Sequence, residues 1–324
     1  MGFDIVHVSN KDLKVKKEYM VYDSIVECVP ELAHLEIWRT KEGFGNARTL
    51  FLKDEKIYFG DNLGNIVVLN SKDGSVLSKY ALHEGIVSQV KFFSNGNRIV
   101  SAGFDDNTVK VTDANTGQVS WTYSGHTDSV TSVYVTNDGV VYSGSLDSTV
   151  KRLSNGAEVW SYQANSAVYD VLFVAGFVYI LTGDGSISKI TNDGNLVWTM
   201  NLSGGVARSF IFDPITYHFY IAMFNGVVHV VTTDNVLIDT IHTSSEKQVF
   251  GVAKTKNAVF TTGSSGNLEK FINSKHAYTH VIGQGAGRGL TVDNFDGIFI
   301  AIDNVGVIKL TQSLQMTGYT DVIS

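Results

Sequence analysis

The sequence has very little cysteine and proline. Its 324 residues include one cysteine, Cys28, and two prolines. A single cysteine excludes an intramolecular disulfide and a metal site built from several thiolates. The shortage of proline, combined with 31 glycines, fits an all-β chain that is rich in hairpin turns.

Long apolar runs are missing as well. The first residues, MGFDIVHVSNKDLKVKK, lack the apolar core of an export signal. No apolar run approaches the roughly 20 residues of a membrane-spanning helix, so we expect no membrane insertion. We therefore expect a cytoplasmic protein, with a virion as the alternative location.

The chain has fewer basic than acidic residues. The chain has 25 lysines and arginines against 32 aspartates and glutamates, a formal net charge of −7. This acidic balance disfavours sequence-independent binding to nucleic acid, so no nucleic-acid partner is expected. We expect the one basic cluster to be a solvated segment. Its members are Lys11, Lys14, Lys16 and Lys17.

The sequence does contain a repeat of about forty residues, which recurs seven times. Each unit predicts four short strands separated by small-residue turns. The position that ends the second predicted strand recurs every 39 to 43 residues, at Gly60, Gly103, Gly144, Gly183, Phe224, Gly263 and Asp303. A period of this size built from four strands is typical of a β-propeller. Radial packing of such sheets buries apolar faces that a single sheet would expose.

The fold class predicted is therefore an all-β, closed β-propeller of four-stranded antiparallel blades. We expect seven blades, with eight as the alternative, in a single domain that spans residues 1–324. The first strands of the blades should begin near Ala47, Ile86, Ser129, Ala167, Gly205, Val249 and Gly287.

Residues near the N-terminus suggest how the ring closes. Residues 34–40, HLEIWRT, have the form of a fourth strand without three strands before it. This strand would complete a blade whose other strands come from the C-terminus. Residues 313–322 also resemble a fourth strand, so a five-stranded closing blade is an alternative. In a second alternative, residues 4–9 and 18–28 belong to an eighth blade. Residues 1–33 are therefore expected to form an N-terminal extension or a partial extra blade. Residues 34–46 would form a closing strand and connector, and residues 47–324 the seven repeats.

Two repeats resemble the WD-repeat family, most clearly residues 124–153. In that family a histidine before the first strand, a serine or threonine on the second strand and an aspartate in the next turn form a hydrogen-bonded chain with a tryptophan. The resemblance implies the structural pairs His83–Asp106 and His126–Asp147. Thr112 and Leu153 occupy the place of the tryptophan.

The repeats also resemble the family named for pyrroloquinoline quinone enzymes. Residues 113–123, DANTGQVSWTY, are similar to its docking motif, and residues 154–160 and 191–198 echo that motif. The resemblance implies that fourth-strand tryptophans join neighbouring blades. The structural tryptophans expected are Trp38, Trp121, Trp160 and Trp198. The acid cluster of that family's quinone site is not visible here, and no cofactor is expected.

Catalytic and metal-binding residues are not expected. His83 and His126 could act as general bases, but each has its own carboxylate partner, which favours a structural role. His276 and His280 have the spacing of a helical zinc site. On a strand this spacing separates them by roughly 13 Å, too far to share one metal ion.

The loops between fourth and first strands should emerge on one face of the ring, around its channel. We expect a partner to contact this face, through the charged loop residues Lys41, Glu84, Asp128, Glu246 and Arg288. Arg288 lies in the glycine-rich segment GQGAGRG (283–289), whose free amides could bind an anion or serve as a flexible connector. We therefore expect Arg288, with its side chain free of blade packing, to contact an acidic segment or an anion.

These features favour a non-enzymatic scaffold that binds a protein through its loop faces. A structural component of a virus or phage particle and a channel-centred ligand-binding or catalytic propeller are the alternatives.

A circular-dichroism spectrum should show less than about one-fifth helix, because ordinary mixed domains already carry about a third. A larger helical signal would contradict the propeller.

Overall fold

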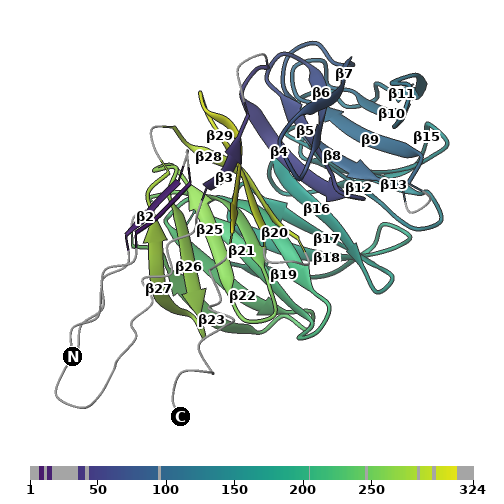
Figure 1. Ribbon diagram of the computed structural model, residues 1–324. Helices are drawn as coiled ribbons and strands as arrows, with labels where there is room; N and C mark the ends of the chain where they lie inside the picture. The colour runs from purple at the N-terminus through teal and green to yellow at the C-terminus, as the bar shows by residue number, and fades with distance from the viewer. Residues whose placement is uncertain are drawn as a thin grey trace.

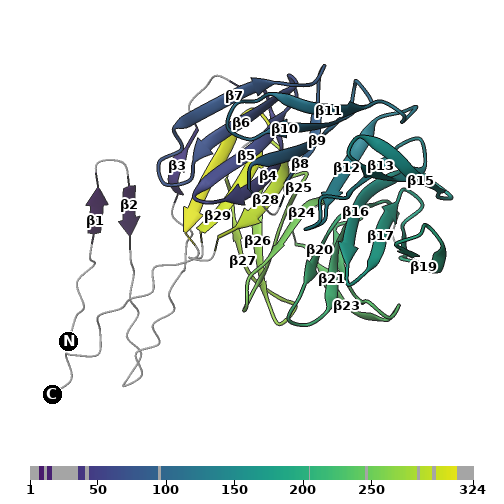
Figure 2. The same ribbon diagram turned by 90° about the vertical axis from the view of Figure 1, so that its right-hand side faces the viewer.

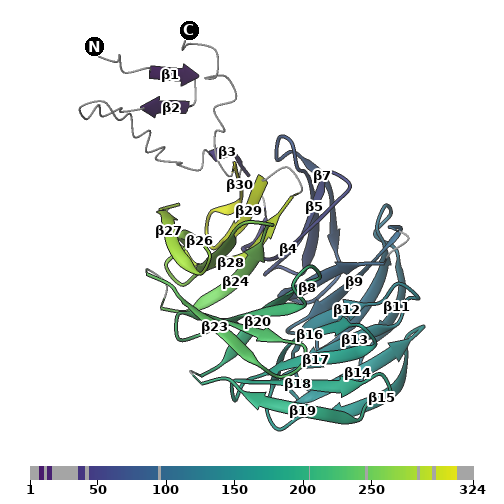
Figure 3. The same ribbon diagram turned by 90° about the horizontal axis from the view of Figure 1, so that it is seen from below.

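The computed structural model describes residues 7–10, 13–16, 36–40, 44–93, 96–203, 205–244, 247–282, 285–293 and 297–311. Within these ranges all regular secondary structure is β-strand. The strands form seven four-stranded antiparallel sheets, the blades, and one separate two-stranded sheet. Figures 1 and 3 show the blades arranged radially around a common axis.

The seven blades follow one another along the chain. Blade 1 consists of β4 (Ala47–Lys53), β5 (Lys56–Asp61), β6 (Asn65–Asn70) and β7 (Val76–Ala81). Blade 2 consists of β8 (Val87–Phe92), β9 (Arg98–Gly103), β10 (Val109–Asp113) and β11 (Val119–Tyr123). Blade 3 consists of β12 (Val130–Val135), β13 (Val141–Ser145), β14 (Thr149–Ser154) and β15 (Ala157–Gln163). Blade 4 consists of β16 (Val168–Val174), β17 (Phe177–Thr182), β18 (Ser186–Thr191) and β19 (Leu196–Asn201).

The remaining three blades complete the ring. Blade 5 consists of β20 (Ala207–Asp213), β21 (His218–Met223), β22 (Val227–Thr232) and β23 (Leu237–His242). Blade 6 consists of β24 (Val249–Lys254), β25 (Val259–Gly263), β26 (Leu268–Ile272) and β27 (Lys275–His280). Blade 7 consists of β28 (Gly287–Val292), β29 (Gly297–Ile302), β30 (Gly306–Thr311) and β3 (Glu36–Arg39), in that spatial order.

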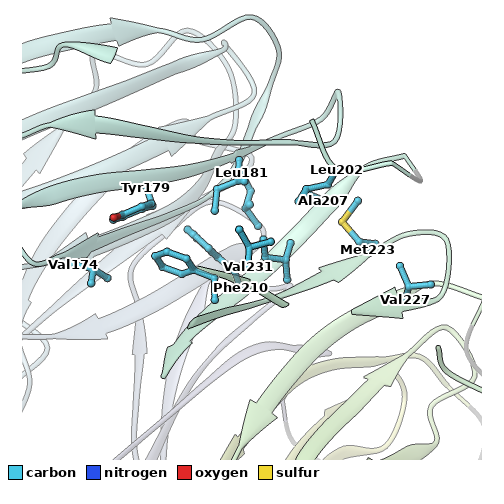
Figure 4. Packing of buried hydrophobic residues seen from close by; sticks show 12 residues of the cluster. Val174, Tyr179, Leu181, Leu202, Ala207, Phe210, Met223, Val227 and Val231 are labelled. Atoms are coloured by element: carbon cyan, nitrogen blue, oxygen red, sulfur yellow. The ribbon is translucent and has the colours of Figure 1, made fainter. Parts of the chain in front are cut away.

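The position of a strand within its blade explains its composition. Second strands such as β17 (FVYILT) and β29 (GIFIAI) are buried along almost their whole length, because a neighbouring blade covers each face. Fourth strands such as β7 alternate between exposed and half-buried residues, because they lie at the outer rim. Large apolar clusters therefore fill the spaces between blades. Figure 4 shows one such cluster, in which Tyr179 and Leu181 of blade 4 pack near Phe210 and Met223 of blade 5.

Contacts between first strands close the ring. Each of the seven first strands contacts the first strands of both neighbouring blades, and β28 contacts β4. The first strands therefore surround the axis without a break. The seven-bladed prediction is confirmed, and the observed first strands begin within two residues of the predicted positions.

The predicted clasp is also present. β3 pairs antiparallel with β30, with Trp38 opposite Lys309 and Arg39 opposite Ile308. Thr40 extends the pairing, since its amide donates to the Val307 carbonyl at 2.9 Å and its hydroxyl accepts from the Val307 amide at 3.0 Å. Figure 3 shows β3 beside β30, so the two ends of the chain share one blade. The competing segment 313–322 lies outside the described residues.

The eight-bladed alternative does not agree with the structure. β1 (His7–Asn10) and β2 (Leu13–Lys16) pair with each other, and among the described residues no third strand joins them. They form a hairpin that stands apart from the blades in Figures 2 and 3. The other segment proposed for an eighth blade, residues 18–28, lies outside the described residues.

Aromatic side chains on the fourth strands join neighbouring blades. Trp38 of blade 7 donates from Nε1 to the Ser71 carbonyl of blade 1 at 3.2 Å, and Trp160 of blade 3 donates to the Asn192 carbonyl of blade 4 at 2.9 Å. The Trp38 ring also covers Gly74, whose positive φ and lack of a Cβ let the ring lie against the turn.

The other fourth-strand aromatics behave alike. Trp121 lies against Gly156 of the next blade, and Trp198 packs on the apolar cluster between blades 4 and 5. In blade 1 a tyrosine takes this role, because Tyr80 donates to the Asn115 carbonyl of blade 2 at 2.9 Å. The sequence motif, which was built around tryptophan, did not identify Tyr80.

Within the described residues, no helix has the length and apolar character needed to cross a membrane.

Replacing Trp38 by alanine should lower the free energy of unfolding by about 2 kcal/mol or more, because the change removes a large half-buried ring and its hydrogen bond at the seam of the ring. Urea denaturation checks this. Ile37→Ala on the same strand should change little, since Ile37 is 45% exposed. Equal effects of the two substitutions would show that β3 contributes only backbone pairing.

Candidate binding face

One face of the ring carries the residues just before the seven first strands, where the connectors from the preceding blades end. In each blade, the residue after the second strand donates its amide to the carbonyl just before the first strand, at 2.8–3.0 Å. The donors are Asn62, Phe104, Leu146, Gly183, Phe224, Ser264 and Asp303. We call this side of the ring the connector face. These seven residues are the true equivalent positions, and the predicted anchors Gly60, Gly103, Gly144 and Gly263 precede them by one or two residues.

The first strands share a second feature at this face. Each has a β-bulge at its second residue, where the pairing with the second strand shifts register. A bulge leaves its extra residue unpaired and re-aims the side chain. The bulge residues are Arg48, Ser88, Thr131, Tyr169, Arg208, Phe250 and Arg288. Because the first strands surround the axis, these residues lie at the centre of the connector face.

Three of the seven bulge residues are arginines, which we call the arginine cluster: Arg48, Arg208 and Arg288. Their sequence contexts are Ala-Arg-Thr, Ala-Arg-Ser and Gly-Arg-Gly. Alignment of the seven repeats at the first strand would have shown this small–arginine–small pattern. Of these three arginines, only Arg288 was predicted as a functional residue, since the glycines around it resemble a loop in sequence.

The expected environment of Arg288 is wrong. Arg288 lies on β28, and its side chain is not free of packing. Its Nε and Nη2 donate to Asp303 Oδ2 at 2.8 and 2.7 Å, and the guanidinium lies 4.8 Å from the centre of the Phe250 ring. Glycines flank Arg288 because neighbouring strands approach closely. A Cβ on Gly289 would lie 3.2 Å from the Leu50 amide nitrogen.

The other two arginines have fewer partners. Arg48 Nη1 is 3.9 Å from Asp303 Oδ1, and its buried Nε has no hydrogen-bond partner among the described residues. Arg208 lies 5.6 Å from the centre of the Tyr169 ring. Burial lowers the pKa of both guanidinium groups. The charge of Asp303 opposes this for Arg48 and that of Asp170 for Arg208, whereas the charge of Arg288 lowers both. Arg48 also lowers the pKa of Arg208, so the three charges repel one another.

A buried carboxylate lies next to this cluster. Asp170 is the residue after the bulge in blade 4, and it accepts the Phe210 amide at 3.2 Å and the Val171 amide at 3.0 Å. Gln89 of blade 2 donates to Asp170 at 3.3 Å, a contact that passes over blade 3 and so reaches across the axis. Burial raises the pKa of Asp170, against the opposing charge of Lys91.

The two histidine–aspartate pairs are in contact. His126 Nδ1 lies 2.8 Å from Asp147 and its Nε2 lies 2.8 Å from Ser143 Oγ. His83 makes the same contacts with Asp106 at 3.0 Å and with Ser101 Oγ at 2.7 Å.

This order of serine, histidine and aspartate matches a hydrolase triad. However, Ser101 and Ser143 are 0% exposed, so no substrate can reach either hydroxyl. The carboxylates also accept the connector amides of Glu84 and Thr127. The two hydrogen-bonded histidine–aspartate networks therefore hold the connectors at Glu84 and Thr127 in place. Buried polar groups with complete hydrogen bonding can do this.

The remaining partner-binding predictions fall into two groups. Glu84 and Asp128 are exposed on the connector face. Lys41 and Glu246 lie outside the described residues. His276 and His280 lie on β27, as expected, and contact Thr279 Oγ1 and the Tyr278 hydroxyl.

Comparison with known proteins identifies one family. A family model described as outer membrane protein assembly factor BamB matches residues 23–136 and 105–234, which together cover more than half of the chain. A search of curated proteins finds no match.

Replacing Asp147 by alanine should cost roughly 1–3 kcal/mol of stability, because it leaves His126 and the Thr127 amide without their acceptor. Asp106→Ala should behave alike, whereas Asp73→Ala, in an exposed turn, should not change the thermal midpoint. Burial opposes ionisation of Asp147, but hydrogen bonds from Thr149, His126 and Thr127 outweigh it and lower its pKa.

A pH series of the same variants adds a second check. A carboxyl whose pKa is lowered by folding stabilises the protein above its unfolded pKa of about 3.9 and loses this effect as the pH falls. The stability difference between wild type and Asp147→Ala should therefore narrow below about pH 4. A difference that stays constant down to pH 2.5 would show that Asp147 is not held as an anion.

Proposed function

The chain belongs to the family described as outer membrane protein assembly factor BamB, a family of β-propellers with pyrroloquinoline-quinone-like repeats, and from this premise we propose that it is a non-enzymatic scaffold. Its connector face docks a segment of a partner protein. The name of the family describes assembly of other proteins, and a rigid ring with loops on flat faces suits such a role. The cytoplasm remains the proposed location.

One observation carries this proposal. Around the first-strand residues at its centre, the connector face carries half-buried apolar turn residues, and exposed charged residues lie on the connectors. Phe104, Leu146 and Phe224 are partly exposed at equivalent turn positions, and Leu63 of blade 1 is 61% exposed. Exposed Glu84 and Asp128 lie on the surrounding connectors. Aromatic, apolar and arginine side chains surrounded by a polar rim are the usual anatomy of a protein–protein interface.

The described parts of the connectors are also held by hydrogen bonds. Asp106 and Asp147 accept connector amides, and the seven turn-to-connector hydrogen bonds hold each connector at its base. A surface that is already ordered loses less conformational entropy on binding. Preorganisation of this kind favours docking over a mechanism that needs moving loops.

A double charge reversal on the connector face tests the proposal. Glu84→Lys combined with Asp128→Lys should weaken binding of the native partner at least about tenfold, because rim charges select the partner and steer its approach. The partner is first captured by cross-linking in the native source, then purified, and its Kd is measured for each variant. Thermal melting verifies that the variants fold.

Lys72→Glu is the matched control, since Lys72 is exposed on the opposite face and pairs there with Glu55. It should leave the Kd unchanged. Loss of binding in this control, with binding retained in the double reversal, would assign docking to the opposite face. Turnover of a substrate by the purified protein would overturn the non-enzymatic role.

A further inference from the structure

The arginine cluster concentrates positive charge in an acidic protein. Arg48, Arg208 and Arg288 come from blades 1, 5 and 7, and the bulges bring all three to the centre of the connector face. The whole chain has a formal net charge of −7. Like charges that lie close together at a partly buried position destabilise a fold unless something offsets their repulsion.

Asp303 offsets only part of this charge. It forms a two-point contact with Arg288 and lies near Arg48, so one carboxylate faces two guanidinium groups. This contact shows that a carboxylate fits the centre of the face. The side chains of Arg48 and Arg288 remain 25% and 31% exposed, so both are accessible from solvent.

Arg208 has no carboxylate partner among the described residues. Its guanidinium carbon lies 5.6 Å from the centre of the Tyr169 ring. The charge of Asp170 raises the pKa of Arg208, but both Asp170 oxygens already accept hydrogen bonds, from Gln89, Val171 and Phe210. Arg208 therefore has its guanidinium donors available, as does Arg48 at its buried, unpartnered Nε.

We propose that the arginine cluster is an oxyanion-binding site, in which Arg208 and Arg48 hold a carboxylate or phosphate group at the centre of the connector face. Guanidinium groups bind planar carboxylates and phosphates through paired, charge-assisted hydrogen bonds. The anion neutralises the repulsion among the arginines that Asp303 and Asp170 leave. Cation–π contacts with Tyr169 and Phe250, at 5.6 and 4.8 Å from the ring centres, help to position the guanidinium groups of Arg208 and Arg288. This inference does not depend on the docking function, because a small anion needs no partner protein.

Calorimetric titration at low salt tests the site with two probes, inorganic phosphate and malonate. The wild-type protein should bind at least one of them saturably with one site per chain, and added sodium chloride should weaken the binding. Arg208→Gln should weaken binding about tenfold or more, which is the loss expected for one charge-assisted pair. Arg208→Lys keeps the positive charge but lacks the planar guanidinium group. Its anion affinity should therefore lie between those of the wild type and Arg208→Gln. Phosphate binding alone indicates a phosphate ligand, and malonate binding alone indicates a carboxylate.

Arg98→Gln is the matched control. Arg98 also stacks on an aromatic ring, 4.3 Å from the centre of Phe93, but it lies at the start of β9, away from the connector face. Its substitution should leave anion binding unchanged. Without ligand, Arg208→Gln should melt no lower than wild type, whereas the bound anion should raise the melting temperature of wild type alone. Absence of saturable binding for both probes, or equal weakening in Arg98→Gln and Arg208→Gln, would overturn the proposal.

Discussion

The closed ring depends on the seam between blades 7 and 1, where β28 meets β4 and the pairing of β3 with β30 completes blade 7. A propeller blade exposes two apolar faces until neighbours cover both, so the first and last blades must meet. Here a strand from the N-terminal side occupies the outer position of the C-terminal blade, and Trp38 then joins that blade to blade 1. Because every blade is covered only in the closed ring, this seam supports the buried second strands throughout the molecule.

Closure also creates the connector face. Once the blades are fixed, the seven turns after the second strands and the seven residues before the first strands meet around one axis, joined by repeated backbone hydrogen bonds. The His83 and His126 chains add buried polar contacts that hold two connectors. In blade 2, the series of hydrogen bonds from His83 ends at Ser101 and does not continue to a tryptophan. Thr112 occupies the tryptophan's place, and its buried hydroxyl has no partner among the described residues.

The chemistry of this face follows from the bulges. A regular first strand would direct its second residue into the blade interface, where an unpaired charge is costly. The bulge removes that residue from the pairing and lets it lie at the axis. Arginine, tyrosine, phenylalanine, serine and threonine can therefore occupy the same position in different blades. The ring thus carries a variable set of side chains on a constant frame, which is where binding specificity can differ between propellers.

The sequence alone determined the architecture, because a blade is a local unit. The forty-residue period, the strand starts and the form of residues 34–40 all reflect short-range patterns of apolar residues and turns. The paired histidines and aspartates were also visible, since each pair lies within one repeat.

Only the tertiary structure decided that β3, rather than residues 313–322, pairs with β30, because two similar segments competed for one distant partner. The tertiary structure also forms the arginine cluster, because its members are far apart in the chain and meet only when the ring closes. Arg288 was assigned to a loop because alternating glycines resemble one in sequence. The close approach of neighbouring first strands, which requires those glycines, exists only in the folded ring.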